Sequence, residues 1–524
     1  MKKILSILLS VLMVFSCCSA MMASAASDHL PQIYVEGLES KGVYYKEDVN
    51  MENPLFFPID GNKLFSELLK YEPLLKEAFA KQNSDLIAAY LTEWIMVCFG
   101  DVALGKDGYT MSDKVMVPET ELIKDADNKY TFKYDCRLGG VDVAVELADY
   151  IERVKADSGY NEVELVASSY GSAVVLALLH EYSPTINKNA VLKDGQKDIL
   201  ESIDSILLCV PSAKGVDFAS ELFSGNIDVK PEALKAFLDD QLNDPEISNL
   251  LSTLIKTGTI GAMLDDMLLP FVNAALMNSV KSVILNVFGT MPSMWSFVDD
   301  EHFVDALINV YGEDYASEDH EYAGLINRIT YYHNNIQNKA TDILKAAEAK
   351  GHEVNIICKY GDPSIPISTK GNVLSDGFVA VTEASFGATA SLNQQTLPAD
   401  YTQAKTDCGH NHMSDDRCID ASTCDFPENT WFIKNLWHGT KSDAYYTMIN
   451  EIVYNDITVH DWEKYPQFLV VPEDNENAIV SLESYLASTE QKEEKETTWL
   501  EDFLAFIKGI IPRLIAMIKG LFNK

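Results

Sequence analysis

Short apolar segments of strand length alternate with segments of helical periodicity along much of this chain, and this alternation constrains its fold more than any other feature. The segments 163–167, 205–210 and 354–360 are apolar over most of their length. Strands of this kind need cover on both faces, as in a parallel sheet lined by helices. Residues 142–155 instead place apolar side chains at i, i+3, i+4 and i+7, the spacing of one helix face. The pattern predicts an α/β fold with a mostly parallel sheet and helices on both faces.

Further predicted strands and helices continue the alternation, and breaks in it divide the chain into units. Further strands are predicted at 32–35 and 431–434, and further helices at 60–97, 174–180 and 442–453. The stretch 215–345 breaks the alternation, is mostly helical, and is interpreted as a helical cap inserted between strands. The predicted units are a core in two parts (26–214 and 346–487), the cap (215–345), a charged linker (488–498) and a C-terminal helix (499–524).

The first residues have the pattern of an export signal. Lys2 and Lys3 precede an apolar run over 4–20, and Ala-Ser-Ala at 23–25 is a small-residue cleavage site. We therefore expect residues 1–25 to be a cleaved signal peptide and the protein to be secreted. Two alternatives are an uncleaved membrane anchor and lipidation at Cys17, which follows an imperfect lipoprotein motif.

The charge balance limits the partners that the protein can bind. The 524 residues include 41 Lys and Arg against 79 Asp and Glu, for a formal net charge of −38. Because hydrophobic residues make up 47% of the chain, its composition is that of a globular protein rather than of a disordered acidic polymer. Nucleic acid is excluded as a partner, since the chain has no excess of cations to displace counterions from a phosphate backbone.

The strongest chemical signal is a serine between the 163–167 strand and the helix that follows. The residues read Ala167-x-Ser169-x-Gly171, which is the nucleophile-elbow pattern with alanine in place of the first glycine. Small residues are needed on both sides of such a serine because larger side chains would strike the neighbouring strand and helix. The pattern predicts that Ser169 is a nucleophile, exposed at the N-terminus of a helix whose N–H groups favour developing negative charge. The alternative is a structural turn serine.

Around this turn the sequence resembles a known group of enzymes. The residues Tyr-Asp-Cys-Arg-Leu at 134–138, then the predicted helix 142–155 and the serine turn, resemble the secreted α/β-hydrolase lipases of the lecithin:cholesterol acyltransferase-like group. That group typically has Trp where Cys136 stands. Residues 31–38 are similar to its first oxyanion strand, and Met-Pro-Ser-Met-Trp at 291–295 is similar to a cap motif. The resemblance implies the α/β-hydrolase fold and a serine enzyme that cleaves or transfers apolar acyl groups.

A nucleophilic serine needs a base and an orienting acid, which follow it in this fold in the order acid, then histidine. Asp376 lies in Ser-Asp-Gly-Phe-Val, which is similar to the acid loop of secreted bacterial lipases, and Asp362 is the alternative acid. His438 stands between the last predicted strand and helix, where the base belongs. The alternative base is His412, in a polar segment that also contains His410.

The oxyanion hole is expected to use two backbone N–H groups. One is that of Tyr170, directly after the nucleophile. Matching the lipase pattern His-Gly-x onto Glu36-Gly37-Leu38 places the second at Leu38. Glu36 in the histidine position is a departure that brings an anionic side chain near the hole.

A polar segment rich in cysteine and histidine follows the predicted acid. Residues 407–412 read Asp-Cys-Gly-His-Asn-His, and Cys418 and Cys424 follow. Zinc or calcium ligation is one interpretation, but a paired Cys-x2-Cys clip is missing. We therefore expect a disulfide-tied loop using Cys408, Cys418 or Cys424, and neither a metal nor another cofactor.

The C-terminal segment 499–524 places its apolar residues on one stripe with Lys508 and Arg513 among its cations. This profile is typical of a helix that lies on a lipid or envelope surface. The alternative is a helix packed on the protein or on a second copy. A transmembrane span is not expected, because the two cations interrupt the apolar run.

Taken together, these features predict a secreted serine hydrolase of carboxylic esters, of lipase or esterase type, acting on a small-molecule or lipid-like ester. Two alternatives remain at the level of sequence. One is acyl transfer to an alcohol with the same residues, and the other is a non-catalytic surface-binding protein that keeps the hydrolase fold.

Overall fold

The computed structural model describes residues 29–56, 66–227 and 281–489, apart from positions 82, 126–127, 282, 366, 456 and 461. The predicted signal peptide and C-terminal helix lie outside the described residues, with most of the predicted linker. So do residues 228–280 of the predicted cap.

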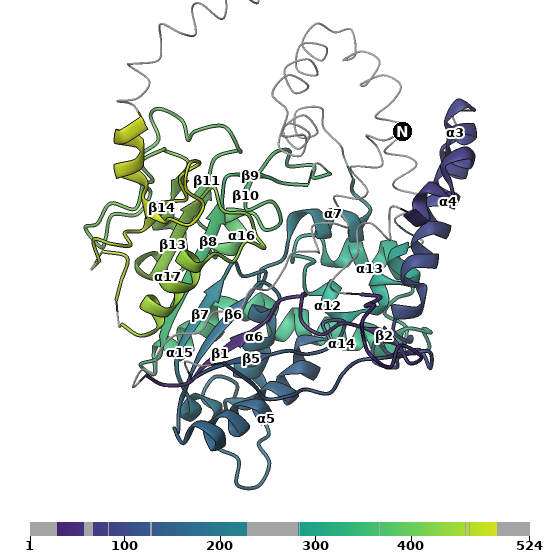
Figure 1. Ribbon diagram of the computed structural model, residues 1–524, viewed down its shortest axis with the longest axis horizontal. Coiled ribbons are helices and arrows are strands. Elements are labelled where there is room, and N and C mark those ends of the chain that lie inside the picture. The colour runs from purple at the N-terminus through teal and green to yellow at the C-terminus, as the bar shows by residue number, and fades with distance from the viewer. Residues whose placement is uncertain are drawn as a thin grey trace, which may run out of the picture.

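The described chain is built on one large, mostly parallel sheet (Figure 1). The two edge strands run antiparallel to their neighbours, and the pairs between them are parallel. With helices around this sheet, the prediction of an α/β fold is confirmed. In spatial order the nine strands are β15 (Val480–Ser481), β14 (Phe468–Val470), β13 (Thr430–Lys434), β8 (Glu353–Tyr360), β7 (Ile203–Cys209), β6 (Val163–Ser168), β1 (Gln32–Val35), β5 (Lys129–Phe132) and β4 (Ile123–Lys124).

Both faces of the sheet are covered, which explains why its central strands are apolar at successive positions. Within β7, Leu208 joins the hydrophobic core on the side of α5 (Gly140–Ser158) and α6 (Gly171–Tyr182). Its neighbour Leu207 joins a second core on the side of α17 (Asp443–Val453). Alternate side chains of a strand point to opposite faces, so a strand between two helix layers needs apolar residues at both sets of positions.

Of the remaining helices described, α15 (Ala340–Glu348) shares the core of α5 and α6. Residues 60–97 were predicted to be helical, and the structure describes α3 (Glu72–Ala80) and α4 (Ser84–Phe99) there; the Asn83 side chain caps α4 by accepting from the N–H of Leu86. Both helices stand on the right of the view in Figure 1, away from β13 and β14. No helix among the described residues has the length and apolarity to cross a membrane. The other described helices are α7 (Asp217–Ser224), α12 (Pro292–Trp295), α13 (Phe303–Tyr311), α14 (Ala323–Asn335) and α16 (Val381–Ala384).

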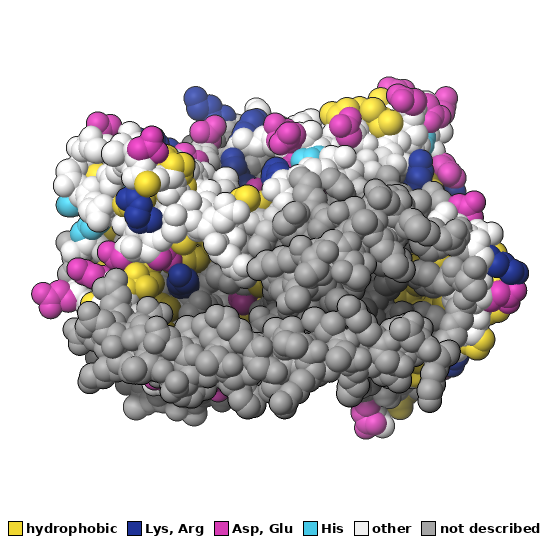
Figure 2. Space-filling view, turned by 90° about the horizontal axis from the view of Figure 1, so that it is seen from above, with side chains coloured by type: hydrophobic (Ala, Val, Ile, Leu, Met, Phe, Trp, Pro, Cys, Tyr) yellow, Lys and Arg dark blue, Asp and Glu magenta, His cyan; other side chains and the backbone are white. Residues whose placement is uncertain are grey.

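Charged side chains are dispersed over the described surface. On the face shown in Figure 2, Asp and Glu side chains are spread around the periphery, with Lys and Arg side chains between them. Over the described surface as a whole, several charges form exposed or partly exposed ion pairs, such as Lys81 with Glu77 and Lys464 with Glu451. Exposed pairs of this kind contribute little to stability, so the core layers stabilise the fold.

The turn from β6 into α6 is packed directly against β1. A Cβ atom at Gly171 would lie 2.5 Å from the carbonyl oxygen of Val35 and 2.8 Å from that of Glu36. Both contacts are shorter than side-chain carbons tolerate, and the obstacles are backbone atoms. Glycine is therefore required at this position if β1 and α6 are to keep their distance.

The variant Gly171→Ala is expected to lower the free energy of unfolding by about 1–3 kcal/mol, because the added methyl group forces the helix and strand apart. Urea unfolding of the purified protein measures this. Gly324→Ala is the matched control, since a Cβ there meets the Asp107 Cα at an ordinary 3.8 Å. A Gly171→Ala variant as stable as the unmodified protein would contradict this packing.

Candidate active site

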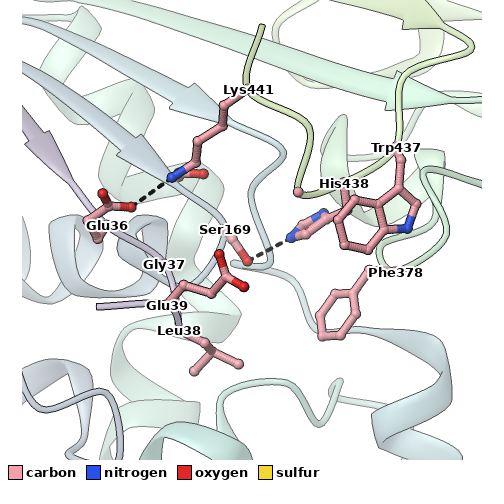
Figure 3. Close-up of a pocket in the computed structure, with 11 residues that line it drawn as sticks. Glu36, Gly37, Leu38, Glu39, Ser169, Phe378, Trp437, His438 and Lys441 are labelled. Carbon is pink, nitrogen blue, oxygen red and sulfur yellow. Dashed lines mark hydrogen bonds and ion pairs between the residues drawn. The ribbon is translucent and has the colours of Figure 1, made fainter. Parts of the chain in front are cut away.

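Ser169 occupies the sharp turn between β6 and α6. Its backbone has φ 52°, in the left-handed region that non-glycine residues rarely adopt. Its N–H donates to the carbonyl of Cys209 in the neighbouring strand at 2.9 Å, which fixes the turn on the sheet. The serine was predicted to be exposed, but it is buried, with 7% of the residue accessible, and its side chain lines a small cavity of about 60 Å³ together with Leu38, Phe378 and Trp437. Figure 3 shows the hydroxyl pointing toward His438.

His438 lies in the loop between β13 and α17, as the sequence predicted. Its Nε2 atom is 3.0 Å from Ser169 Oγ, although 269 positions separate the two residues. The Phe378 ring packs against the imidazole with ring centroids 5.0 Å apart. The geometry places a titratable nitrogen within hydrogen-bond reach of the serine hydroxyl.

Asp376 supports the other nitrogen of this ring. Its Oδ2 atom is 2.7 Å from His438 Nδ1, and the carboxylate is fully buried. The second oxygen, Oδ1, accepts hydrogen bonds from the N–H groups of Phe378 and Val379 at 3.0 and 2.7 Å. The N–H of His438 also donates to the Asp376 carbonyl at 2.9 Å. These bonds leave the carboxylate one orientation, in which Oδ2 faces the imidazole.

The alternative acid, Asp362, lies beside Asp376, and the alternative base, His412, lies in a separate cluster. Asp362 is in β9 (Asp362–Pro363), which pairs with β10 (Leu374–Ser375), and the carboxylate bonded to His438 is that of Asp376. His412 is fully buried and its ring contacts Gln467, Cys408 and Glu428. The structure therefore brings Asp376 and His438, but neither alternative, to Ser169.

The segment after β1 passes close to the serine. A Cβ atom at Gly37 would lie only 3.6 Å from Ser169 Oγ, so this part of the backbone runs beside the hydroxyl. Leu38 follows and lines the cavity (Figure 3). Tyr170, the other residue expected to supply an N–H, directly follows the serine and caps the N-terminus of α6.

The segment 134–138 holds these backbone groups in place. The Tyr134 hydroxyl donates to the carbonyl of Glu36 at 2.6 Å, and the Tyr170 hydroxyl donates to that of Leu138 at 2.7 Å. Arg137 is fully buried and pairs with Asp135 through two hydrogen bonds of 2.9 and 2.7 Å. The segment 134–138 therefore supports the loop after β1, which runs beside Ser169.

An ion pair that the sequence did not reveal neutralises Glu36. Lys441 Nζ lies 2.9 Å from Glu36 Oε2, and both side chains are largely buried (Figure 3). Burial alone lowers the pKa of the Lys441 ammonium, but Tyr34 and Glu36 outweigh it and raise that pKa. Because Lys441 follows His438 and Glu36 precedes Leu38, the pair joins the two loops that flank Ser169.

Lys359 is a second buried cation that sequence reasoning missed. It stands in β8, and its ammonium donates to the carbonyls of Trp437, His438 and Thr440 at 3.4, 3.1 and 2.8 Å. Burial lowers the pKa of this ammonium to about 8, against the opposing effect of the Asp376 carboxylate. Lys359 therefore holds the loop that contains His438 through three of its carbonyls. The sequence did not reveal this because the lysine stands within a mostly apolar strand.

The cysteines depart from expectation. Cys408, Cys418 and Cys424 are free thiols, so the expected disulfide-tied loop is wrong for this structure. Cys209 and Cys358 are buried in the hydrophobic cores, whereas Cys98 is half-buried.

Comparison with known proteins gives little further information. The chain matches no family model and no curated protein. Among solved structures it resembles a chain from "The crystal structure of Tle4-Tli4 complex", with 10% sequence identity and a TM-score of 0.23, covering 64% of this chain and 75% of that chain. A TM-score this low supports no conclusion about fold family or function.

The buried ammonium of Lys359 makes stability depend on pH. Its pKa of about 8 in the folded chain is below the ordinary 10.5, so the unfolded chain binds more protons between these values. This lysine therefore adds to stability as pH rises through that window. The stability of the unmodified protein relative to Lys359→Met is expected to increase by about 1–3 kcal/mol from pH 8 to pH 10.

Urea unfolding at the two pH values measures this difference. Lys345→Met is the matched control, because this lysine is half-exposed and its Nζ lies 3.8 Å from the Asp425 carboxylate. A stability difference between the unmodified protein and Lys359→Met that stays constant or shrinks as pH rises would contradict the described burial.

Proposed function

We propose that this chain is a secreted serine hydrolase of carboxylic esters with the α/β-hydrolase fold, in which Ser169, His438 and Asp376 form a catalytic triad. The observation that carries the proposal is the line of two hydrogen bonds from Asp376 through His438 to Ser169. The residues follow β6, β8 and β13 of a mostly parallel sheet, in the chain order serine, acid, histidine. That order is the one α/β-hydrolases use.

Each residue would have one task in the first half of the reaction. Ser169 Oγ attacks the ester carbonyl carbon while His438 Nε2 takes the hydroxyl proton. Asp376 keeps the other ring nitrogen protonated and stabilises the imidazolium that forms. His438 then gives its proton to the departing alcohol, and the acyl group stays on Ser169. In the second half, water attacks this acyl-enzyme with His438 again as base, which releases the acid.

The oxyanion formed in both halves needs donors already in place. We assign the backbone N–H groups of Leu38 and Tyr170 to this task. The Gly37 backbone runs beside Ser169 Oγ, and Tyr170 occupies the N-cap position of α6, whose N-terminal dipole favours negative charge. The bonds from the hydroxyls of Tyr134 and Tyr170 to neighbouring carbonyls would keep these N–H groups from turning away.

The acyl side of the substrate is proposed to be apolar. Leu38, Phe378 and Trp437 form the apolar part of the cavity lining beside the serine, where an acyl chain would pack, whereas Glu36, Glu39 and Lys441 supply charged groups to the same cavity. The resemblance of segments 134–138 and 291–295 to lecithin:cholesterol acyltransferase-like lipases points the same way. Lipid-like esters are therefore the substrate class that we propose.

The test is hydrolysis of p-nitrophenyl esters from acetate to palmitate by the mature protein. Ser169→Ala and His438→Ala are expected to lower kcat by about 10⁴-fold or more, because each removes a reacting group. Asp376→Asn is expected to lower kcat by a factor on the order of 10⁴. The chain length with the highest kcat/KM would distinguish an esterase from a lipase.

Asp362→Asn is the matched control for Asp376→Asn, since both remove one carboxylate from the same region of the chain. It should keep kcat within a few-fold of the unmodified protein. If Ser169→Ala retained full activity, the triad would be wrong. If the folded, unmodified protein hydrolysed no ester of the series, the alternative of a non-catalytic surface-binding protein would take its place.

A further inference from the structure

A second cluster of reactive side chains lies at the opposite end of β13 from Ser169. Cys408, His410, His412 and Glu428 each offer one ligand atom, and these four atoms all lie within 4.8 Å of one another. Glu428 lies two residues before the start of β13, whereas His438 follows that strand. The proposed ester hydrolysis uses none of the four residues.

The distances within the cluster are close to those around a tetrahedral metal ion. His412 Nε2 lies 3.2 Å from Cys408 Sγ and 3.3 Å from Glu428 Oε1, and His410 Nδ1 lies 3.2 Å from Glu428 Oε2. Zinc bonds of 2.0–2.3 Å place neighbouring ligand atoms about 3.3–3.8 Å apart. An ion at the centre would therefore require only small adjustments of the side chains.

The orientation of His412 is fixed by a residue outside the cluster. Gln467 Nε2 donates to the carbonyls of Pro427 and Thr430 at 2.7 and 3.1 Å, so its Oε1 must act as an acceptor. This oxygen lies 2.7 Å from His412 Nδ1, which must therefore carry the proton. The lone pair of the neutral ring is then on Nε2 and faces the cluster. Metal-binding histidines are usually held in this way by a partner of their other nitrogen.

A third segment of the chain closes the cluster. His460 Nε2 lies 3.1 Å from Glu428 Oε2, and its ring packs against that of His410 with centroids 3.9 Å apart and a 40° angle between the rings. The backbone N–H of Val459 also donates to the Glu428 carbonyl at 2.9 Å. Segments around 410, 428 and 460 therefore meet at one point.

We propose that Cys408, His410, His412 and Glu428 bind one Zn²⁺ ion that joins the segment 408–412 to the residues just before β13. A thiolate and two imidazoles are donors that favour zinc, whereas calcium requires six to eight oxygen ligands and the cluster supplies one carboxylate. Four protein ligands leave no position for substrate, which is typical of a structural zinc site. The ion would anchor the polar segment before β13, in place of the disulfide that the sequence suggested.

The experiment uses the full mature chain with a purification tag that contains no histidine. Elemental analysis of protein purified without added metal is expected to give about one zinc per chain. Replacing zinc with Co²⁺ should produce the visible bands of a tetrahedral site and a cobalt–thiolate charge-transfer band. Cys408→Ser should abolish the charge-transfer band, and Cys408→Ser and His410→Ala should each weaken zinc binding at least about tenfold. Both residues are exposed, so their loss leaves the core unchanged.

Cys418→Ser is the matched control, because Cys418 lies in the same segment but outside the cluster. It should keep both the bound zinc and the cobalt–thiolate band. Ser169→Ala should do so as well, which separates this proposal from the proposed ester hydrolysis. Unmodified protein that binds no zinc or only calcium would overturn the proposal. Equal loss of zinc in Cys408→Ser and Cys418→Ser would also overturn it.

Discussion

The close approach of β1 to the turn between β6 and α6 is the constraint on which the rest of the site depends. Only a glycine fits at position 171, where a Cβ would lie 2.5 Å from the Val35 carbonyl oxygen. The contact forces the chain to turn sharply, and Ser169 adopts φ 52°. Such a backbone costs on the order of 1–3 kcal/mol and persists only where the surroundings impose it. Here the buried strands on both sides impose it, and the hydroxyl is directed out of the sheet toward His438.

Two buried lysines then hold the loops around this serine. Lys359 donates to carbonyls on both sides of the His438 position, and Lys441 pairs with Glu36 at the start of the loop that reaches Leu38. Without Lys441, Glu36 would be an anion beside the proposed oxyanion hole and would oppose catalysis. Glu36 stands where the lipase pattern has histidine. Its ion pair with Lys441 connects the two loops, although the paired residues lie 405 positions apart in the sequence.

Local pattern was enough to predict β1, β6, β7, β8 and β13, the helices α5, α6 and α17 and the serine turn, because each depends on neighbouring residues. The outer strands β4, β5, β14 and β15 were not predicted. The choice between Asp376 and Asp362 stayed open, since it depends on two backbone N–H groups that orient one carboxylate after folding. The roles of Lys359 and Lys441 were missed because their partners are distant in sequence. For the same reason the cysteine-rich segment was misread as disulfide-tied: Glu428 and His460 join it only in the folded chain.

The central claim is that His438 activates Ser169. Reaction with diethyl p-nitrophenyl phosphate, followed by intact-mass measurement and peptide mapping, tests it most directly, because this reagent phosphorylates an activated serine and releases p-nitrophenol. We expect one diethylphosphoryl group per chain, located on Ser169, and none on the His438→Ala variant under the same conditions. Labelling at another residue, or equal labelling of Ser169 in the two proteins, would contradict the account.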